Sequence, residues 1–327
     1  SVSAAGDING DGFSDVIAGA YGFNSNTGKA YIYFGSESMD TTADLSFTGE
    51  SANNYFGNSV RTCGDVNGDG YPEVIAGAHG YGSFTGRTYI YDYFMKNEIF
   101  PELTLTGPSA GIVFGASVSS AGDVNGDGFP DIIAGAPAYS SNTGRAYIFF
   151  GGISMDNNAD IILTGEAISN LFGGSVSSAG DVNGDGFSDV IVGANAYSAN
   201  TGRTYIYFGG SVMDNTADVI MTGVSTYDFG TSVSSAGDVN GDGFSDVIVG
   251  ADGYFNVRGK AFIYLGGISM DNVSDVTLLG DSLYSYIGHS VSSAGDVNGD
   301  GYSDVIVGNP SSLNSYYGFG EAYIFFG

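Results

Sequence analysis

The chain has 327 residues, including 55 Gly and no Trp, and its 36 acidic and 8 basic side chains give a formal net charge of −28. Glycine lies far above its usual share of about 7%, which argues against a helical fold, and the charge disfavours nucleic acid and anionic membrane surfaces as partners. With 43% hydrophobic and 14% aromatic residues, the chain has enough packing material to fold and does not read as an acidic disordered segment.

The sequence shows no signal for membrane insertion and no pair of cysteines. No apolar run approaches the ~20 residues that cross a bilayer, and the N-terminal Ser-Val-Ser-Ala has neither a basic start nor an apolar stretch. We therefore expect a soluble chain or a processed fragment. The single Cys63 stands where other copies of its segment have Ala, so we expect a small buried apolar residue rather than a reactive thiol.

A short acidic string recurs along the whole chain. Gly-Asp-Val-Asn-Gly-Asp-Gly, or a close variant, appears six times, with its first aspartate at Asp7, Asp65, Asp123, Asp181, Asp238 and Asp296. The spacing of 57 or 58 residues exceeds that of the common helical repeats and fits a four-stranded propeller blade with generous loops.

Each repeat reads as four short β-strands, A to D, separated by turn residues. In the third repeat we expect strand A at Phe114 to Ala121, strand B at Asp131 to Ala136, strand C at Arg145 to Phe150 and strand D at Asp160 to Thr164. Strand B is rich in β-branched residues and strand C in aromatic and β-branched residues, both typical of strands. No stretch has a sustained helical period, so the prediction is all-β.

The terminal repeats are as apolar as the central ones, whereas an open solenoid needs polar caps at both ends. We therefore predict a six-bladed β-propeller of four-stranded blades, forming one domain over residues 1–327. Only five D segments are present, because strand C of the sixth repeat, Ala322 to Phe326, is followed by Gly327 alone. The last blade is expected to lack its outer strand within this chain, and its free edge is a template for another strand.

The repeated nonapeptide Asp-x-Asn-Gly-Asp-Gly-(Phe/Tyr)-x-(Asp/Glu) predicts a Ca²⁺ site in every repeat. Side-chain oxygens at positions 1, 3, 5 and 9 and the carbonyl at position 7 would supply the oxygens that Ca²⁺ prefers, and Gly at position 6 permits the tight turn. One isolated copy would be read as a hairpin turn, but six copies with an acid held at position 9 favour metal sites. EF-hand loops need an acid at position 12, where these loops have residues such as Ala18 and Val192.

About six Ca²⁺ ions are thus predicted, one per repeat. The expected ligands are Asp7, Asn9, Asp11, Phe13 and Asp15; Asp65, Asn67, Asp69, Tyr71 and Glu73; Asp123, Asn125, Asp127, Phe129 and Asp131; Asp181, Asn183, Asp185, Phe187 and Asp189; Asp238, Asn240, Asp242, Phe244 and Asp246; and Asp296, Asn298, Asp300, Tyr302 and Asp304. The second loop has Glu73 in place of Asp, and we expect it to keep a site of altered affinity.

Two further motifs give a family resemblance. A Phe-Gly element occurs at Phe56-Gly57, Phe114-Gly115, Phe172-Gly173 and Phe229-Gly230, and a complete Gly-Ala-Pro element at Gly135-Ala136-Pro137. With the acidic loops, these residues resemble the FG-GAP repeats of integrin α-subunit propellers and of bacterial surface proteins, over essentially the whole chain. The resemblance implies a propeller whose calcium loops lie opposite the face that meets ligands. Integrin propellers have seven blades, and the absence of cysteine pairs points to an exported protein of a bacterium or archaeon.

Strand alternation assigns the connections to two ends of each blade. The A–B loops and C–D turns should share one end, which also collects the acids Asp40, Asp44, Glu98, Glu102, Asp156, Asp160, Asp214, Asp218, Asp271 and Asp275. The B–C and D–A connections share the other end, with the basic residues Lys29, Arg87, Arg145, Arg203, Arg258 and Lys260 and the repeated aromatics Phe23, Tyr81, Tyr139, Tyr197 and Tyr254. We expect these aromatics to pack between blades.

An enzyme is not expected. The only histidines, His79 and His289, occupy unrelated repeat positions and suit surface or packing roles, and no catalytic set or phosphate-binding loop can be assembled. We predict a calcium-stabilised extracellular adhesion or protein-interaction module that binds a protein or glycan on the end opposite the calcium loops. One alternative is a structural subunit of a surface filament, completed by a donated strand; another is a calcium-dependent lectin.

Overall fold

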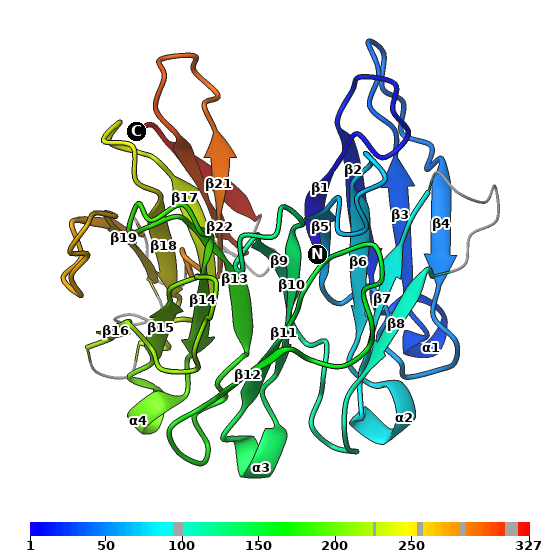
Figure 1. The fold of residues 1–327 in the computed structure, drawn as a ribbon, viewed down its shortest axis with the longest axis horizontal. Coiled ribbons are helices and arrows are strands. Elements are labelled where there is room, and N and C mark those ends of the chain that lie inside the picture. The colour runs from blue at the N-terminus through cyan, green and yellow to red at the C-terminus, as the bar shows by residue number, and fades with distance from the viewer. Residues whose placement is uncertain (94–100, 225–226, 254–257, 281–284, 311–319) are drawn as a thin grey trace. The chain divides into compact units, whose positions relative to one another are not determined.

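The computed structural model describes residues 1–93, 101–224, 227–253, 258–280, 285–310 and 320–327. Each repeat forms one antiparallel sheet, in the simple order A-B-C-D, and the six sheets are the blades of a β-propeller (Figure 1). Among the described residues, five blades have four strands and the sixth has three, as the sequence predicts.

The strands of the six blades recur at the same repeat positions. Strands A are β1 (Val2–Gly6), β5 (Val60–Gly64), β9 (Val118–Gly122), β13 (Ser175–Gly180), β17 (Ser232–Gly237) and β21 (Ser290–Gly295). Strands B are β2 (Asp15–Ala20), β6 (Glu73–Ala78), β10 (Asp131–Ala136), β14 (Asp189–Ala194), β18 (Asp246–Ala251) and β22 (Asp304–Asn309). Strands C are β3 (Lys29–Tyr33), β7 (Arg87–Tyr91), β11 (Arg145–Phe149), β15 (Arg203–Tyr207), β19 (Lys260–Tyr264) and β23 (Glu321–Phe325). Strands D are β4 (Leu45–Thr48), β8 (Leu103–Thr106), β12 (Ile161–Thr164), β16 (Val219–Thr222) and β20 (Val276–Leu279).

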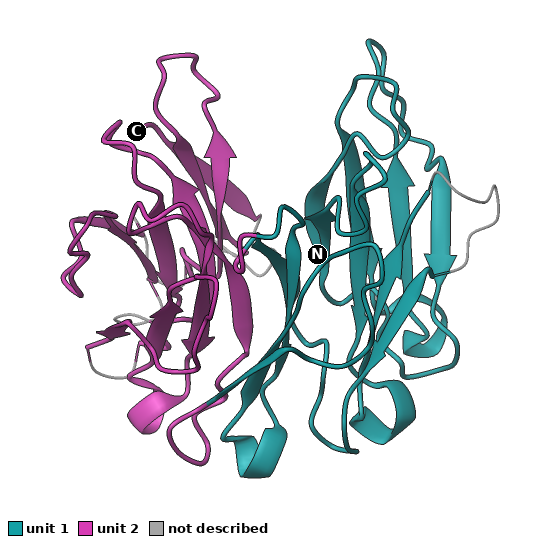
Figure 2. Ribbon diagram, in the orientation of Figure 1, with its two compact units in different colours: residues 1–123, 127–164 teal, residues 124–126, 165–327 magenta. Residues whose placement is uncertain are grey.

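The blades divide into two compact units (Figure 2). Unit 1 comprises Ser1–Asp123 and Asp127–Thr164 and holds blades one to three; unit 2 comprises Val124–Gly126 and Gly165–Gly327 and holds blades four to six. Within each unit, the A strands of successive blades contact one another.

The strand boundaries predicted for the third repeat hold for strand B and shift at the others. Strand A begins at Val118 rather than Phe114, because Phe114 makes only an isolated parallel bridge to Gly86 of the preceding blade. Strand C ends one residue earlier, at Phe149, and strand D begins one residue later, at Ile161. The Phe-Gly element thus belongs to the contact between blades and not to a strand.

Glycine pairs bring neighbouring blades into close contact. A Cβ on Gly19 of β2 would lie 2.0 Å from the carbonyl oxygen of Gly57, in the Phe-Gly element of the next blade. The pairs Gly77–Gly115, Gly193–Gly230 and Gly250–Gly288 repeat this approach. The glycines of the two sequence motifs are therefore needed for contact between blades within a unit, where no side chain fits.

The core is built from the same repeat positions in each blade. Phe56 is buried, and its ring meets those of Tyr89 and Tyr91 edge-on, in a cluster that also contains Ile32 of blade one. Phe114, Phe172 and Phe229 occupy equivalent positions. Cys63 is fully buried in the cluster shared by blades two and three, which confirms its expected packing role.

Four helical turns are the only helices among the described residues: α1 (Phe23–Asn26), α2 (Tyr81–Phe84), α3 (Tyr139–Asn142) and α4 (Tyr197–Asn200). Each connects strand B to strand C, and in unit 1 the three turns lie together at one end of the strands, away from the A–B loops (Figure 1). We call this the B–C end and the other the acidic end. None of the helices in the described part of the chain is long and apolar enough to cross a membrane.

Candidate metal sites in the acidic loops

Each acidic nonapeptide joins strand A to strand B immediately after a β-bulge. In blade four the register shifts between Ser178 and Gly180, and Gly180 then pairs with Asp189, the acid at position 9. The bulge ends strand A, and the acid begins strand B. The same irregularity occurs in the other blades, so the fold places position 9 at the base of every loop.

Side-chain oxygens fold each loop by accepting backbone N–H groups. In blade four, Asp181 accepts the N–H groups of Gly184 at 2.7 Å, Asp185 at 3.1 Å and Gly186 at 2.9 Å. Asn183 Oδ1 accepts the Asp185 N–H at 2.9 Å, and Asp185 Oδ1 accepts the Phe187 N–H at 3.0 Å. Blades one, two, five and six have the same Asn and Asp acceptors at positions 3 and 5. The loop conformation is therefore set by the residues that the sequence predicts as ligands.

The acid at position 9 is buried in all six blades. In blade four, Asp189 Oδ2 accepts the N–H of Val182, and Oδ1 accepts the N–H of Gly209 after strand C, both at 2.8 Å. Asp15, Asp246 and Asp304 make both contacts, and Asp131 makes the one to Gly151. One carboxylate thus joins the loop to the end of strand C.

Burial makes the carboxyl groups of Asp189 and Asp246 hard to ionise. It raises the pKa of Asp189 to about 7 and that of Asp246 to about 6, against the opposing effect of their backbone hydrogen bonds and with a smaller contribution from neighbouring aspartates. The ion pairs that the structure describes join Arg87 to Glu50, Arg203 to Glu166 and His289 to Asp252. Buried carboxylates without a cation are costly.

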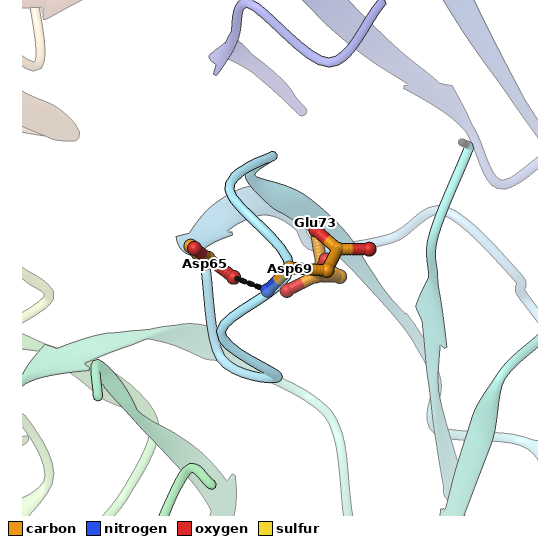
Figure 3. Close-up of side chains that lie close together, drawn as sticks. All are labelled: Asp65, Asp69 and Glu73. Carbon is orange, nitrogen blue, oxygen red and sulfur yellow. Dashed lines mark hydrogen bonds between the residues drawn. The ribbon is translucent and has the colours of Figure 1, made fainter. Parts of the chain in front are cut away.

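The second loop departs from this pattern, because two of its carboxylate oxygens are buried without a hydrogen-bond partner. Oxygens of Asp65, Asp69 and Glu73 lie within 4.8 Å of one another (Figure 3). Glu73 Oε2 accepts the N–H of Val66 at 2.8 Å, whereas Glu73 Oε1 and Asp69 Oδ2 are buried without a hydrogen-bond partner. Burial, followed by the charges of Asp69 and Asp65 and against the Val66 hydrogen bond, raises the pKa of Glu73 to about 8. This donor set fits a hard cation such as Ca²⁺.

The asparagine at position 3 explains why the second loop differs. In loops one, four, five and six its amide Nδ2 donates to Oδ2 of the position 5 aspartate, at 2.8 to 2.9 Å. In the second loop Asn67 instead donates to Glu102 at 3.3 Å, which leaves Asp69 Oδ2 free. Among the described residues, a group of three acids able to share a metal is found only here. The third loop is divided between the two units, and within unit 1 Asp123 and Asp127 accept the same N–H groups as elsewhere.

Sequence reasoning missed why position 7 is aromatic. The ring of Phe244 covers Gly184, position 4 of the preceding loop, so closely that a Cβ there would lie 2.4 Å from Cε1 of the ring. Tyr71 on Gly10, Phe129 on Gly68, Phe187 on Gly126 and Tyr302 on Gly241 repeat the contact. Positions 4 and 7 therefore join successive loops, and only the carbonyl of position 7 is left for a metal.

Eight of the ten acids predicted near the C–D turns accept backbone N–H groups there. Asp44, Asp160, Asp218 and Asp275 accept the N–H groups of Phe34, Phe150, Phe208 and Leu265, one residue after strand C. Asp40, Asp156, Asp214 and Asp271 close the C–D turns through the N–H group two residues later. Glu98 lies outside the described residues.

At the B–C end, the repeated aromatics lie on basic residues of their own blade. The Arg87, Arg145 and Arg203 guanidinium carbons lie 3.6, 3.7 and 3.8 Å from the ring centres of Tyr81, Tyr139 and Tyr197, and Lys29 faces Phe23. Packing between blades, as predicted, is seen for Tyr139, which contacts the cluster of blades two and three. Tyr254 lies outside the described residues.

The two histidines have the surface and packing roles expected from the sequence. The His79 ring stacks on that of Tyr55, with centroids 4.9 Å apart, and burial lowers its pKa. His289 Nδ1 lies 2.8 Å from Asp252 Oδ2, and this hydrogen bond raises the His289 pKa. They lie in different units.

Comparison with known proteins identifies the repeat. The FG-GAP repeat model matches residues 1–33, 56–91, 114–149, 172–207, 229–264 and 288–325, which is more than half of the chain. The matched segments contain strands A to C of every blade, including the acidic loops.

Relatives among curated proteins are integrin alpha subunits. Integrin alpha-2 of Bos taurus is 41% identical over 88 residues, which cover 24% of this chain and 7% of the integrin. Integrin alpha-4 of Xenopus laevis is 32% identical over 137 residues, covering 38% and 13%, and integrin alpha-8 of Mus musculus is 32% identical over 134 residues, covering 38% and 12%. The similarity thus concerns a small part of each integrin.

Proposed function

Because this chain belongs to the FG-GAP repeat family, we propose that it is a calcium-stabilised, extracellular protein-interaction module without enzymatic activity. The free oxygens of Asp69 and Glu73 in the second loop are the observation that carries the calcium proposal. Two buried carboxylate oxygens without a hydrogen-bond donor, on acids of one cluster, are unfavourable, and a divalent cation would satisfy both.

We extend the proposal to all six loops, whose acids at positions 1, 5 and 9 occur in the same order. In loops one, four, five and six, an ion would have to displace the asparagine amide from the position 5 carboxylate. The second loop has no such bond to break, so it should bind first. Weak loops of this kind are filled at the millimolar Ca²⁺ found outside cells, which supports an extracellular location.

We place a protein partner at the B–C end. That end has the Arg–Tyr stacks and exposed aromatics such as Phe23 and Phe84, whereas the other end has the acidic loops. Arginine and aromatic side chains are enriched in protein interfaces, and carboxylates are depleted. The integrin alpha relatives make adhesion the leading role for this surface.

Calcium-dependent unfolding tests the proposal. Each site that binds only the folded chain adds about 2.7 kcal/mol at a hundredfold excess over its Kd, so several sites should raise the melting temperature by many degrees. We expect a large rise in Tm, measured by circular dichroism, between EDTA and millimolar CaCl₂. An equal Tm in both would overturn the calcium assignment, and an equal rise with choline chloride at matched ionic strength would assign the effect to screening.

A second candidate role is that of a structural subunit that assembles through the free edge of blade six. The observation in its favour is the three-stranded sheet β21-β22-β23, where the other blades have four strands. Sedimentation velocity over a range of protein concentrations tests it: assembly should increase with concentration, and a constant monomer would exclude it.

A further inference from the structure

A cavity of about 420 Å³ lies between blades four and five, inside unit 2. Four aromatic side chains line it: Tyr227, Phe229, Phe262 and Tyr264. The rings of Phe229 and Phe262 meet edge-on, with centroids 5.6 Å apart. Asn272 Nδ2 donates to the Ile220 carbonyl at 3.2 Å and so joins the C–D turn of blade five to strand D of blade four. Ligand pockets have volumes of about 300–1,000 Å³ and aromatic linings of this kind.

One of the residues that line this cavity is charged, and it is Lys260, the first residue of strand C in blade five. Its Nζ lies 5.6 Å from the centre of the Phe262 ring. An ammonium group has three N–H donors and no acceptor, so Lys260 can hold an anion while it stays beside this ring. The cavity therefore combines aromatic walls with one positive charge.

Two other blades show which group lies on the base at this repeat position. Arg87 and Arg203 begin strand C of blades two and four, as Lys260 begins that of blade five. Arg87 Nη1 donates to Glu50 at 2.7 Å, and Arg203 Nη1 donates to both oxygens of Glu166, at 3.0 and 2.9 Å. In both blades the base thus holds a carboxylate of the chain itself, from the residue two positions after strand D of the preceding blade.

The cavity between blades one and two shows this carboxylate beside aromatic rings. Glu50 lines that cavity of about 310 Å³ together with Tyr89 and Tyr91, and it also accepts the Tyr89 hydroxyl at 2.6 Å. Between blades four and five, the repeat position of Glu50 is held by Val224, which is 73% exposed. No residue in the lining of this second cavity is acidic. A carboxylate at this place would have to come from another molecule.

We propose that the cavity between blades four and five binds a small organic acid. Its carboxylate would contact the Lys260 ammonium, in the place that the Glu50 carboxylate has beside Arg87. Its aromatic or aliphatic body would lie on the rings of Phe262 and Tyr227, where burial of apolar surface supplies affinity. This site is separate from the acidic loops, and it requires neither bound calcium nor a protein partner.

The test uses the full chain and naphthylacetate, which joins a flat aromatic body to one carboxylate. The control compound is naphthylacetamide, which has nearly the same shape and no charge. Isothermal titration calorimetry should show saturable binding of the acid at one site. Binding of the amide should be at least about tenfold weaker, a ratio equivalent to about 1.4 kcal/mol. Absence of binding by the acid, or equal binding of the two compounds, would overturn the proposal.

Three variants locate the site. Lys260→Gln should weaken binding of naphthylacetate at least about tenfold, whereas Lys29→Gln, which removes the base at the same position of blade one, should bind it as the parent does. Val224→Glu places a carboxylate of the chain itself at the position of Glu50, so it should also prevent binding without lowering the Tm. Circular dichroism verifies that each variant is folded. Undiminished binding by Val224→Glu, or an equal loss in the two lysine variants, would contradict the assigned site.

Discussion

Glu73 shows how one longer side chain changes an otherwise repeated site. At its repeat position, four of the aspartates use both oxygens to hold backbone N–H groups, whereas Glu73 holds that of Val66. Its second oxygen is buried without a hydrogen-bond partner, in a cluster with Asp65 and Asp69. Glu73 therefore makes a structural hydrogen bond with one oxygen and keeps the other available as a metal ligand.

Replacing this donor should weaken the response to calcium. We expect Glu73→Gln to lower the calcium-induced stabilisation by up to about 2.7 kcal/mol, the value of one site at a hundredfold excess over Kd, and to leave the Tm in EDTA nearly unchanged. The matched control is Glu37→Gln, which removes an exposed acid outside the loops. Paired melts in EDTA and CaCl₂ measure both; an equal loss in the two variants would indicate a general charge effect.

His289 makes a contribution to folding stability that depends on pH, and the sign of that dependence follows from its pKa shift. Its hydrogen bond to Asp252 raises its pKa above the unfolded value, so its stabilisation is present below the unfolded pKa and is lost as pH rises through the folded pKa. Asp252 also raises the pKa of Asp228, after burial, which shows that its negative charge reaches both neighbours. Because the His289 side chain is 57% exposed, the effect should be only a few tenths of a kcal/mol.

The variant His289→Gln should accordingly be less stable than the parent at about pH 5.5 and equal to it at about pH 8.5, above the ordinary histidine pKa. Urea midpoints at the two pH values measure the difference. A destabilisation that grows with pH would contradict the assigned pairing.

At the scale of the strand and loop, the contact between successive A–B loops is the least expected feature. Gly184 and Gly186 both have positive φ, +77° and +92°, yet only Gly184 lies beneath a ring of the next blade. A substitution at Gly186 therefore measures the cost of the backbone conformation alone, and a substitution at Gly184 measures that cost together with the loss of the contact between blades.

Gly186→Ala should cost about 1 kcal/mol for its left-handed backbone, and Gly184→Ala a further 1–3 kcal/mol or so for the clash with Phe244. Denaturant unfolding in EDTA removes any calcium contribution from the comparison. Combining Gly184→Ala with Phe244→Ala should recover part of the loss, since the obstructing ring is gone. If the costs of the two glycine variants are equal, the ring contact does not carry the energy assigned to it.

At the scale of the whole molecule, the net charge of −28 should make stability depend on salt when calcium is removed. Raising NaCl from about 0.05 M to about 0.5 M shortens the Debye length severalfold and screens repulsion among the acidic loops. We expect Tm in EDTA to rise with NaCl and to change much less in saturating CaCl₂, because bound ions have already reduced the repulsion. A calorimetric series at both conditions measures this, and equal slopes would contradict it.

The repeat period and the strand patterns predicted the six blades and the missing strand of the sixth, because both depend on local sequence. The contact partners of the individual loop residues could not be predicted in the same way. Asp189 holds the backbone of Gly209, 20 residues along the chain, whereas Glu73 holds only that of Val66, and Phe244 meets Gly184 of another blade. Such contacts depend on three-dimensional neighbours that the spacing of one motif does not contain. The predicted ligand set remains a prediction until an ion is observed.

The contact between ring and glycine always runs the same way, from the ring of one repeat to the glycine of the repeat before it. Repeats two to five each have both parts of this contact: an aromatic ring that covers the glycine of the preceding loop, and a glycine that is covered by the ring of the following loop. A duplicated segment of 58 residues would therefore contain both the aromatic residue and the glycine, and the neighbouring repeats could contact it without a change in sequence. In-frame duplication of the coding sequence can therefore add a blade to such an array without requiring a new kind of contact between blades.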